Sequence, residues 1–146
     1  MSVGGRPLAG PRILRCNLFR LSVTFSTSRV SMDIKPSITV IGLGYVGLPL
    51  AVELAGHFSV KGFDINEKRI RILQAGKDPN GEVADEDLAN SGLEVSAEPH
   101  VIAGADILII AVPTPIDDHK TPDLTPVIKA SETVGRVMKK GAIVCY

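Results

Sequence analysis

Three glycines and one acid in this 146-residue chain have the types and spacing that bind phosphate groups and sugar hydroxyls. Gly42, Gly44 and Gly47 form the pattern G-x-G-x-x-G directly after an apolar run at residues 38–41. A second apolar run ends at Asp64, twenty-two residues after the first of these glycines. In a strand–turn–helix setting such glycines approach a pyrophosphate, and such an acid accepts hydrogen bonds from an adenosine ribose. The pattern predicts a dinucleotide site that takes NAD, because the acid would repel the 2′-phosphate of NADP.

Each glycine is expected to have its own mechanical role. Gly42 permits the tight turn, Gly44 lets the backbone approach the phosphates, and Gly47 lets the next helix pack closely on the sheet. The N-terminus of that helix offers N–H groups and the positive end of its dipole. The alternative is a tight connection that binds no ligand, and the acid at the expected position disfavours it.

The elements that must position these residues alternate between strands and helices. Strands are predicted near residues 37–41, 59–64, 93–96, 106–112 and 142–146, and helices near 45–56, 67–74, 85–89 and 125–138. This alternation predicts an α/β fold of the Rossmann type, a doubly wound parallel sheet that is incomplete at its C-terminus. The first strand should lie beside the 106–112 strand, so that the turn at 113–115 faces the glycine turn across a crevice.

Local signals predict core positions and helix ends. Val46, Leu50 and Leu54 repeat at helical spacing and should face the sheet. Asn66 should cap the second helix, and Thr125 should cap the last helix just before a proline.

Two further residues have open roles. Arg69 lies five residues after Asp64 and would reach the adenosine side of the site, although a surface arginine fits the spacing equally well. Thr114 follows the buried strand, where its hydroxyl would bond a ribose or a phosphate, or is an incidental residue of a Pro-x-Pro turn. Cys16 and Cys145 lack a C-x-x-C partner, and the histidines at 57, 100 and 119 lack ligand spacing. We therefore expect no metal site and no catalytic residue.

Charge is distributed unevenly along the chain. Residues 1–31 hold five arginines and no acid, so the rest holds eleven of the sixteen basic residues and all sixteen acids. We expect no nucleic-acid partner and no membrane span. Residues 1–33 are excluded from the fold, either as an organellar transit peptide or as a stretch before a natural start at Met32. The predicted dinucleotide-binding domain is 34–146.

Four stretches, in this order, resemble the UDP-glucose/GDP-mannose dehydrogenase family: residues 41–50, 62–66, 112–115 and 122–126. The last of them, followed to residue 135, is most similar to bacterial UDP-N-acetylhexosamine 6-dehydrogenases of surface-polysaccharide synthesis. The resemblance covers about residues 38–146.

The resemblance implies an NAD-dependent oxidation of a UDP-sugar 6-hydroxyl to a carboxylate in two steps, through a thiohemiacetal and a thioester on a cysteine. By the matching motifs, Tyr45 and Val46 would contact the cofactor in the phosphate turn. Asp64 and Arg69 would bind the adenosine ribose side, and Val112 and Thr114 would contact the cofactor from the other turn.

Chains of this family run past twice the present length, with the catalytic cysteine, a lysine and the substrate domain downstream. Cys145 does not match the motif of the nucleophile. We therefore expect a fragment that keeps the NAD site without the catalytic residues, from a cytoplasmic protein that is a homo-oligomer when complete. The alternatives are a fragment of a UDP-glucose 6-dehydrogenase, a non-catalytic nucleotide-binding module, or a different dinucleotide enzyme such as a hydroxyacid dehydrogenase.

Overall fold

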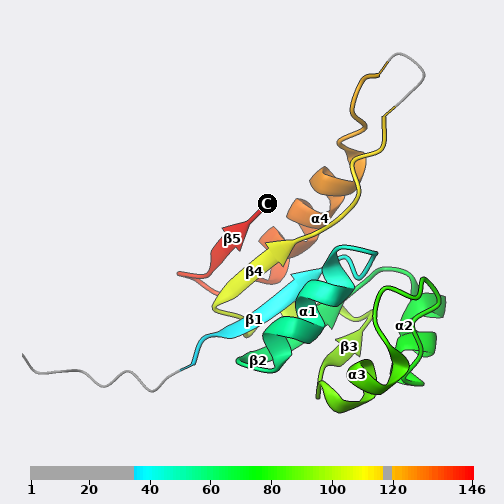
Figure 1. Ribbon diagram of the computed structural model, residues 1–146. Helices are drawn as coiled ribbons and strands as arrows, with labels where there is room; N and C mark the ends of the chain where they lie inside the picture. The colour runs from blue at the N-terminus through cyan, green and yellow to red at the C-terminus, as the bar shows by residue number, and fades with distance from the viewer. Residues whose placement is uncertain (1–34, 117–119) are drawn as a thin grey trace, which may run out of the picture. The chain divides into compact units, whose positions relative to one another are not determined.

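A five-stranded sheet forms the centre of the computed structural model, which describes residues 35–116 and 120–146 (Figure 1). All pairings are parallel, and the strand order is β3-β2-β1-β4-β5. The strands are β1 (Ser37–Ile41), β2 (Ser59–Phe63), β3 (Glu94–Ser96), β4 (Ile107–Ile110) and β5 (Ile143–Cys145). The helices are α1 (Gly47–Ala55), α2 (Glu67–Gln74), α3 (Asp85–Asn90), the 3-10 turn η1 (Pro99–Ile102) and α4 (Thr125–Val137). The predictions for the 1–33 leader, Cys16 and His119 lie outside the described residues.

The strand order makes β1 the switch point of the sheet. From β1 the chain proceeds outward through β2 and β3, and then returns to place β4 on the other side of β1. In such a sheet a crevice opens at the carboxyl ends of the two strands where the direction reverses. The doubly wound parallel sheet and the neighbouring positions of β1 and β4 are both confirmed.

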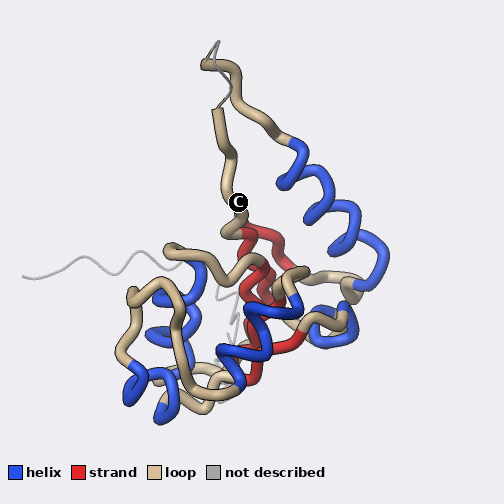
Figure 2. Tube along the Cα trace, turned by 90° about the vertical axis from the view of Figure 1, so that its right-hand side faces the viewer, coloured by secondary structure: helices blue, strands red, loops and turns tan. Residues whose placement is uncertain are grey.

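Alternating side chains of the strands supply two separate cores. Ile38 and Val40 of β1 pack in one core with side chains of α1, α2 and α3, whereas Ile41 packs in the other with η1 and α4. Figure 2 shows the strands between these two layers of helices. Thr39 is buried in β1, and its hydroxyl donates to the Val101 carbonyl at 3.1 Å. Apolar residues on both faces are what a strand covered by two helical layers requires.

Helix α1 begins two residues later than predicted. The glycine turn includes Tyr45 and Val46, and Val46 is 55% exposed as the N-cap residue. The prediction that Val46 faces the sheet is therefore wrong. Leu48 and Ala51 fill the core instead, with Leu54 packed partly buried against them.

The two predicted N-caps have different outcomes. Asn66 caps α2 as expected, since its side chain accepts a hydrogen bond from the Arg69 N–H at 3.2 Å. Thr125 is not the cap of α4 but its first residue, and its N–H donates to the Asp123 carboxylate at 2.9 Å. An acid two residues upstream thus satisfies an N–H group of the helix in place of the predicted threonine.

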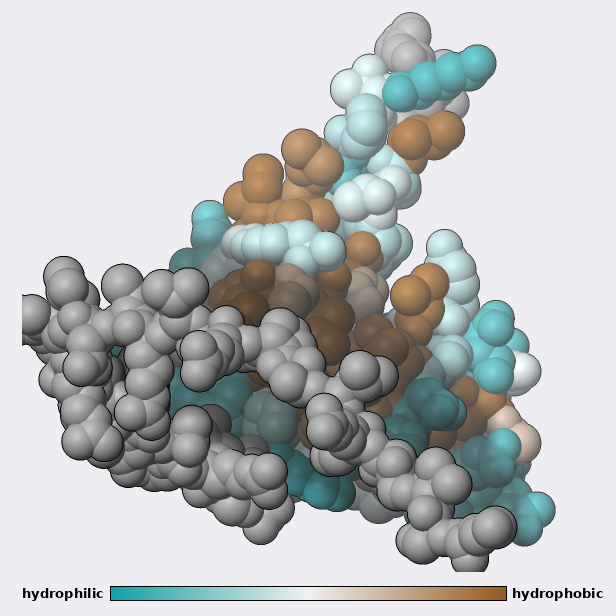
Figure 3. All heavy atoms as spheres, turned by 60° about the vertical axis from the view of Figure 1, so that its left-hand side comes forward, coloured by the Kyte–Doolittle hydropathy of each residue, from teal (hydrophilic) through white to brown (hydrophobic). Residues whose placement is uncertain are grey.

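β5 lies at one edge of the sheet, next to β4. Ile143 and Tyr146 at this edge are 59% and 76% exposed. Apolar side chains remain visible on this side of the molecule in Figure 3. In the two described segments no helix has both the length and the apolar character needed to cross a membrane.

Asp106 ties together three elements at the amino ends of the strands. Its carboxylate accepts hydrogen bonds from the Ser37 N–H and hydroxyl, each at 2.8 Å, and from the Lys139 ammonium at 2.6 Å. The Lys139 hydrogen bond, followed by those of Ser37, holds the pKa of the Asp106 carboxyl well below its ordinary value. The ionised carboxylate therefore joins the starts of β1 and β4 to the segment after α4.

Replacing Asp106 with asparagine is expected to lower the melting temperature at pH 7. Because the folded-state pKa is depressed, the stabilisation is fully present above the unfolded-state pKa of about 3.9 and is lost as the pH falls further. Melts between pH 7 and pH 3 should show the gap between wild type and Asp106→Asn narrowing below about pH 4. Glu53→Gln, an exposed carboxylate of α1, is the matched control. A gap that is absent at pH 7, or that widens in acid, would contradict this role.

Candidate functional site

The glycine turn connects β1 to α1, and its glycines are required for different reasons. Gly42 has a φ of +92°, a left-handed conformation, and a Cβ there would lie 2.8 Å from the Ala111 carbonyl oxygen. At Gly47 a Cβ would lie 1.8 Å from the Gly42 carbonyl oxygen. Around Gly44, no heavy atom of the described residues beyond its chain neighbours lies within 4 Å of that position. Close contacts with the backbone therefore require glycine at positions 42 and 47. At position 44, by contrast, the absence of a side chain leaves an open space.

Backbone donors surround this open space. Within the part of the chain that the structure describes, the N–H groups of Gly44, Tyr45 and Val46 have no hydrogen-bond acceptor. They stand at the N-terminus of α1, where the helix dipole adds a partial positive charge. Such a group of N–H donors is suited to phosphate oxygens.

Asp64 follows β2 and holds the glycine turn in place. One of its carboxylate oxygens accepts from the Leu43 N–H at 2.9 Å, and the other accepts from the Asn66 N–H at 2.8 Å. The carboxylate therefore lies beside the turn, as the sequence pattern requires for an acid that binds the ribose.

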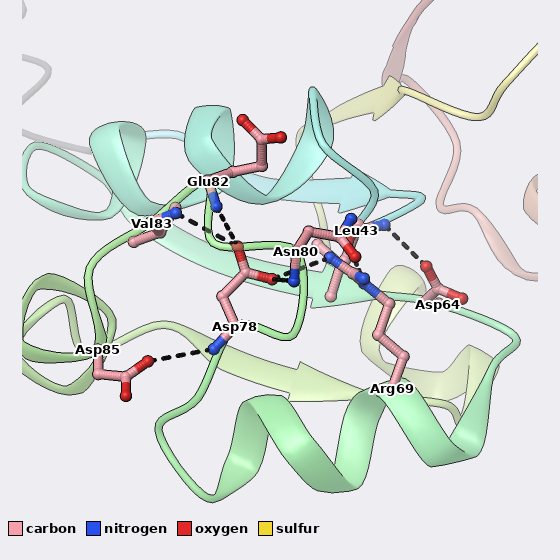
Figure 4. Close-up of polar contacts among 8 residues, drawn as sticks. All are labelled: Leu43, Asp64, Arg69, Asp78, Asn80, Glu82, Val83 and Asp85. Carbon is pink, nitrogen blue, oxygen red and sulfur yellow. Dashed lines mark hydrogen bonds and ion pairs between the residues drawn. The ribbon is translucent and has the colours of Figure 1, made fainter.

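Arg69, from α2, contacts the backbone of the same residue, Leu43. Its Nε donates to the Leu43 carbonyl oxygen, and its Nη2 lies 3.4 Å from Oδ1 of Asp78 (Figure 4). The Arg69 side chain is only 13% exposed. Leu43 is thus held at both ends of its backbone, with its N–H on Asp64 and its carbonyl on Arg69. We call this arrangement the Leu43 clamp.

A pocket of about 790 Å³ opens at the switch point. The carboxyl ends of β1, β2 and β4 form its floor, and one face of α4 forms a wall. It is lined by Ile41, Gly42, Gly44, Phe63, Asp64, Ile65, Asn66, Arg69, Ala111, Val112, Pro113, Asp123, Thr125, Pro126, Lys129, Ala130, Glu132, Thr133 and Arg136. Its volume lies within the range of about 300–1,000 Å³ that is typical of small-molecule sites.

Five of the nine predicted site residues line this pocket: Gly42, Gly44, Asp64, Arg69 and Val112. The other four do not. Tyr45 and Val46 are 66% and 55% exposed on the turn, and Gly47 is buried beneath it. Thr114 is exposed just beyond Pro113, which lines the pocket.

The wall that α4 contributes to the pocket was not predicted from the sequence. Lys129, Thr133 and Arg136 recur at intervals of four and three residues on this helix and all line the pocket. That spacing is visible in the sequence and indicates one helical face. The buried residues of the helix, Ala130 and Val134, pack in the core.

The donor set fits a dinucleotide. N–H groups face an open space at Gly44, a carboxylate lies next to them, and the pocket continues toward Val112. Among the described residues no group of three histidines, cysteines or acids could hold a metal ion. Cys145, in β5, is exposed and does not line the pocket.

Comparison with known proteins shows the family of this domain. Residues 36–146 match the NAD binding domain of the UDP-glucose/GDP-mannose dehydrogenase family. Over 110 residues the chain is 53% identical to UDP-N-acetyl-D-glucosamine 6-dehydrogenase of Salmonella typhi, covering 75% of this chain and 26% of that protein. It is 50% identical to Protein CapL of Staphylococcus aureus, with the same two coverages. The chain thus spans about a quarter of the length of these curated relatives.

Solved structures agree with the sequence relatives. The UDP-N-acetyl-mannosamine dehydrogenase of Staphylococcus aureus aligns with a TM-score of 0.62 at 36% identity, covering 74% of this chain and 27% of that one. An NDP-N-acetyl-D-galactosaminuronic acid dehydrogenase from Methanosarcina mazei aligns with a TM-score of 0.65 at 28% identity, covering 75% and 26%. The chain therefore belongs to the UDP-glucose/GDP-mannose dehydrogenase family, and the part of the family that it matches is the NAD binding domain.

Proposed function

We propose that this chain is the cofactor-binding part of a cytoplasmic UDP-sugar 6-dehydrogenase and binds NAD in the switch-point pocket. The observation that carries the proposal is the Leu43 clamp, which places the Asp64 carboxylate next to the open space at Gly44. The N–H groups of the turn would hold the pyrophosphate, and Asp64 would accept hydrogen bonds from the adenosine ribose. Bound NAD supplies the hydride acceptor for oxidation of the sugar.

We propose a UDP-N-acetylhexosamine as the sugar, with N-acetylglucosamine favoured. Relatives named UDP-N-acetyl-D-glucosamine 6-dehydrogenase are 50–53% identical to this chain, whereas the UDP-N-acetyl-D-mannosamine dehydrogenase of Escherichia coli is 37% identical. The product would be the corresponding uronic acid. Because the chain spans 26% of the length of its relatives, we assign the sugar-binding and catalytic groups to the remainder of a longer protein, and the isolated chain is expected to be inactive.

Roles at the cofactor are proposed for seven more of the predicted site residues according to their positions. Gly42 and Gly47 shape the turn, and Gly44, Tyr45 and Val46 offer their N–H groups to the phosphates. Val112 contacts the cofactor from the floor of the pocket, and Thr114 contacts it from the rim when the cofactor extends past Pro113.

Calorimetric titration of the 146-residue chain should show NAD binding at least about tenfold more tightly than NADP, a difference of about 1.4 kcal/mol. The reason is the repulsion between Asp64 and a 2′-phosphate at the ribose position. Asp64→Asn should weaken NAD binding and reduce the preference. Equal or tighter binding of NADP would remove Asp64 from its proposed role.

Substitutions at Gly44 and Gly47 should separate the effect on NAD binding from the effect on folding. Gly44→Ala should lower the NAD affinity at least about tenfold with little change in melting temperature, because the new methyl group enters the open space. Gly47→Ala should destabilise the fold by about 3 kcal/mol or more, because its Cβ meets a backbone carbonyl. Gly104→Ala, another open glycine at the opposite end of β4, is the matched control and should change neither property. If Gly44→Ala binds NAD like the wild type, the turn does not cradle the phosphates.

A further inference from the structure

Asp78 lies after α2, outside every motif that points to the cofactor, yet its side chain is completely buried. Its carboxylate accepts hydrogen bonds from the N–H groups of Asn80 at 3.1 Å, Glu82 at 2.8 Å and Val83 at 3.2 Å. These bonds organise the loop between α2 and α3. Since the pocket lining excludes Asp78, direct contact with the cofactor does not explain its burial.

One side chain joins this loop to the cofactor site. Arg69 directs its Nη2 to Oδ1 of Asp78 at 3.4 Å and its Nε to the Leu43 carbonyl (Figure 4). Both donors lie on the same edge of the planar guanidinium, so fixing one of them fixes the direction of the other. Asp78 therefore orients the half of the Leu43 clamp that Arg69 provides.

The charge of Asp78 has a second consequence. Arg69 and Asp64 hold the backbone of the same residue, Leu43, and line the same pocket. Without the Asp78 carboxylate, the guanidinium would be a mobile cation with Asp64 as an alternative partner. An ion pair between them would occupy the carboxylate that we assign to the ribose.

We propose that Asp78 is a positioning residue for cofactor binding. It keeps Arg69 on the Leu43 carbonyl and away from Asp64, so that the turn and the ribose-binding carboxylate are arranged before NAD arrives. This inference rests on the proposed NAD site and adds to it a residue that does not touch the cofactor. A purely structural role, in which Asp78 only shapes its own loop, is the competing explanation.

The test compares the wild-type 146-residue chain with Asp78→Asn, Arg69→Lys and the double variant. Asp78→Asn keeps an acceptor for the loop but removes the charge, and Arg69→Lys keeps the charge but removes the Nε donor. Each single variant should bind both NAD and ADP-ribose about tenfold more weakly in calorimetry. The affinity of the double variant should be no lower than that of the weaker-binding single variant, because both substitutions break the same link from Asp78 through Arg69 to Leu43. Glu67→Gln, which breaks the exposed pair between Glu67 and Arg71 on the same helix, is the control and should bind like the wild type.

A local readout separates positioning from loop structure. In amide NMR spectra of the ligand-free chain, Asp78→Asn should shift the Leu43 and Gly44 signals, and Glu67→Gln should not. Wild-type affinity for NAD in both single variants, or losses of binding free energy that add in the double variant, would overturn this inference but leave the proposed function standing. If Asp78→Asn does not fold, Asp78→Glu takes its place in the comparison and should likewise weaken NAD binding and shift the Leu43 and Gly44 signals. Failure of the wild type to bind NAD and ADP-ribose would overturn the proposed function and this inference together.

Discussion

The site depends on the fixed backbone orientation of one residue, Leu43, whose two flanking peptide groups are both held by side chains. Asp64 accepts its N–H at 2.9 Å and Arg69 donates to its carbonyl, so two side chains from separate elements hold the turn between β1 and α1. Below it, Gly47 brings α1 against the Gly42 carbonyl more closely than any other residue type would permit. The turn therefore has little freedom, and the open space at Gly44 and the nearby N–H groups are arranged without a ligand. Such preorganisation reduces the entropy that binding must otherwise overcome.

The sheet supplies the positions that the clamp connects. Parallel pairing brings the carboxyl ends of β1, β2 and β4 to the same edge, with Ile41 opposite both Phe63 and Ile110. Asp64 and Val112 follow two of these ends, so residues far apart in the sequence meet at one pocket. At the amino ends of the strands, Asp106 joins the starts of β1 and β4 to Lys139. The Asp106–Lys139 ion pair and the switch-point pocket therefore lie at opposite ends of the strands.

Much of the fold could be predicted because its signals are local. The bounds of β1 follow from a short apolar run, and the start of α2 follows from one capping side chain, Asn66. Val46 was misplaced because helical spacing does not reveal where a glycine turn ends and a helix begins. The link from Asp78 through Arg69 to Leu43 crosses three elements, and no periodicity or motif encodes it. Likewise, the wall formed by α4 becomes part of the site only when that helix packs against β4, next to β1 in the sheet.

Amide chemical-shift mapping of the 146-residue chain during an NAD titration tests the central claim most directly. The largest changes should occur at residues 42–47, at 64–66 and at 111–113, the three segments that meet at the switch point. A second pocket of about 520 Å³, lined by residues of α2, α3 and β3, provides an internal comparison and should show little change. Saturable changes confined to that second pocket, or no saturable change at the glycine turn, would contradict NAD binding at the Leu43 clamp.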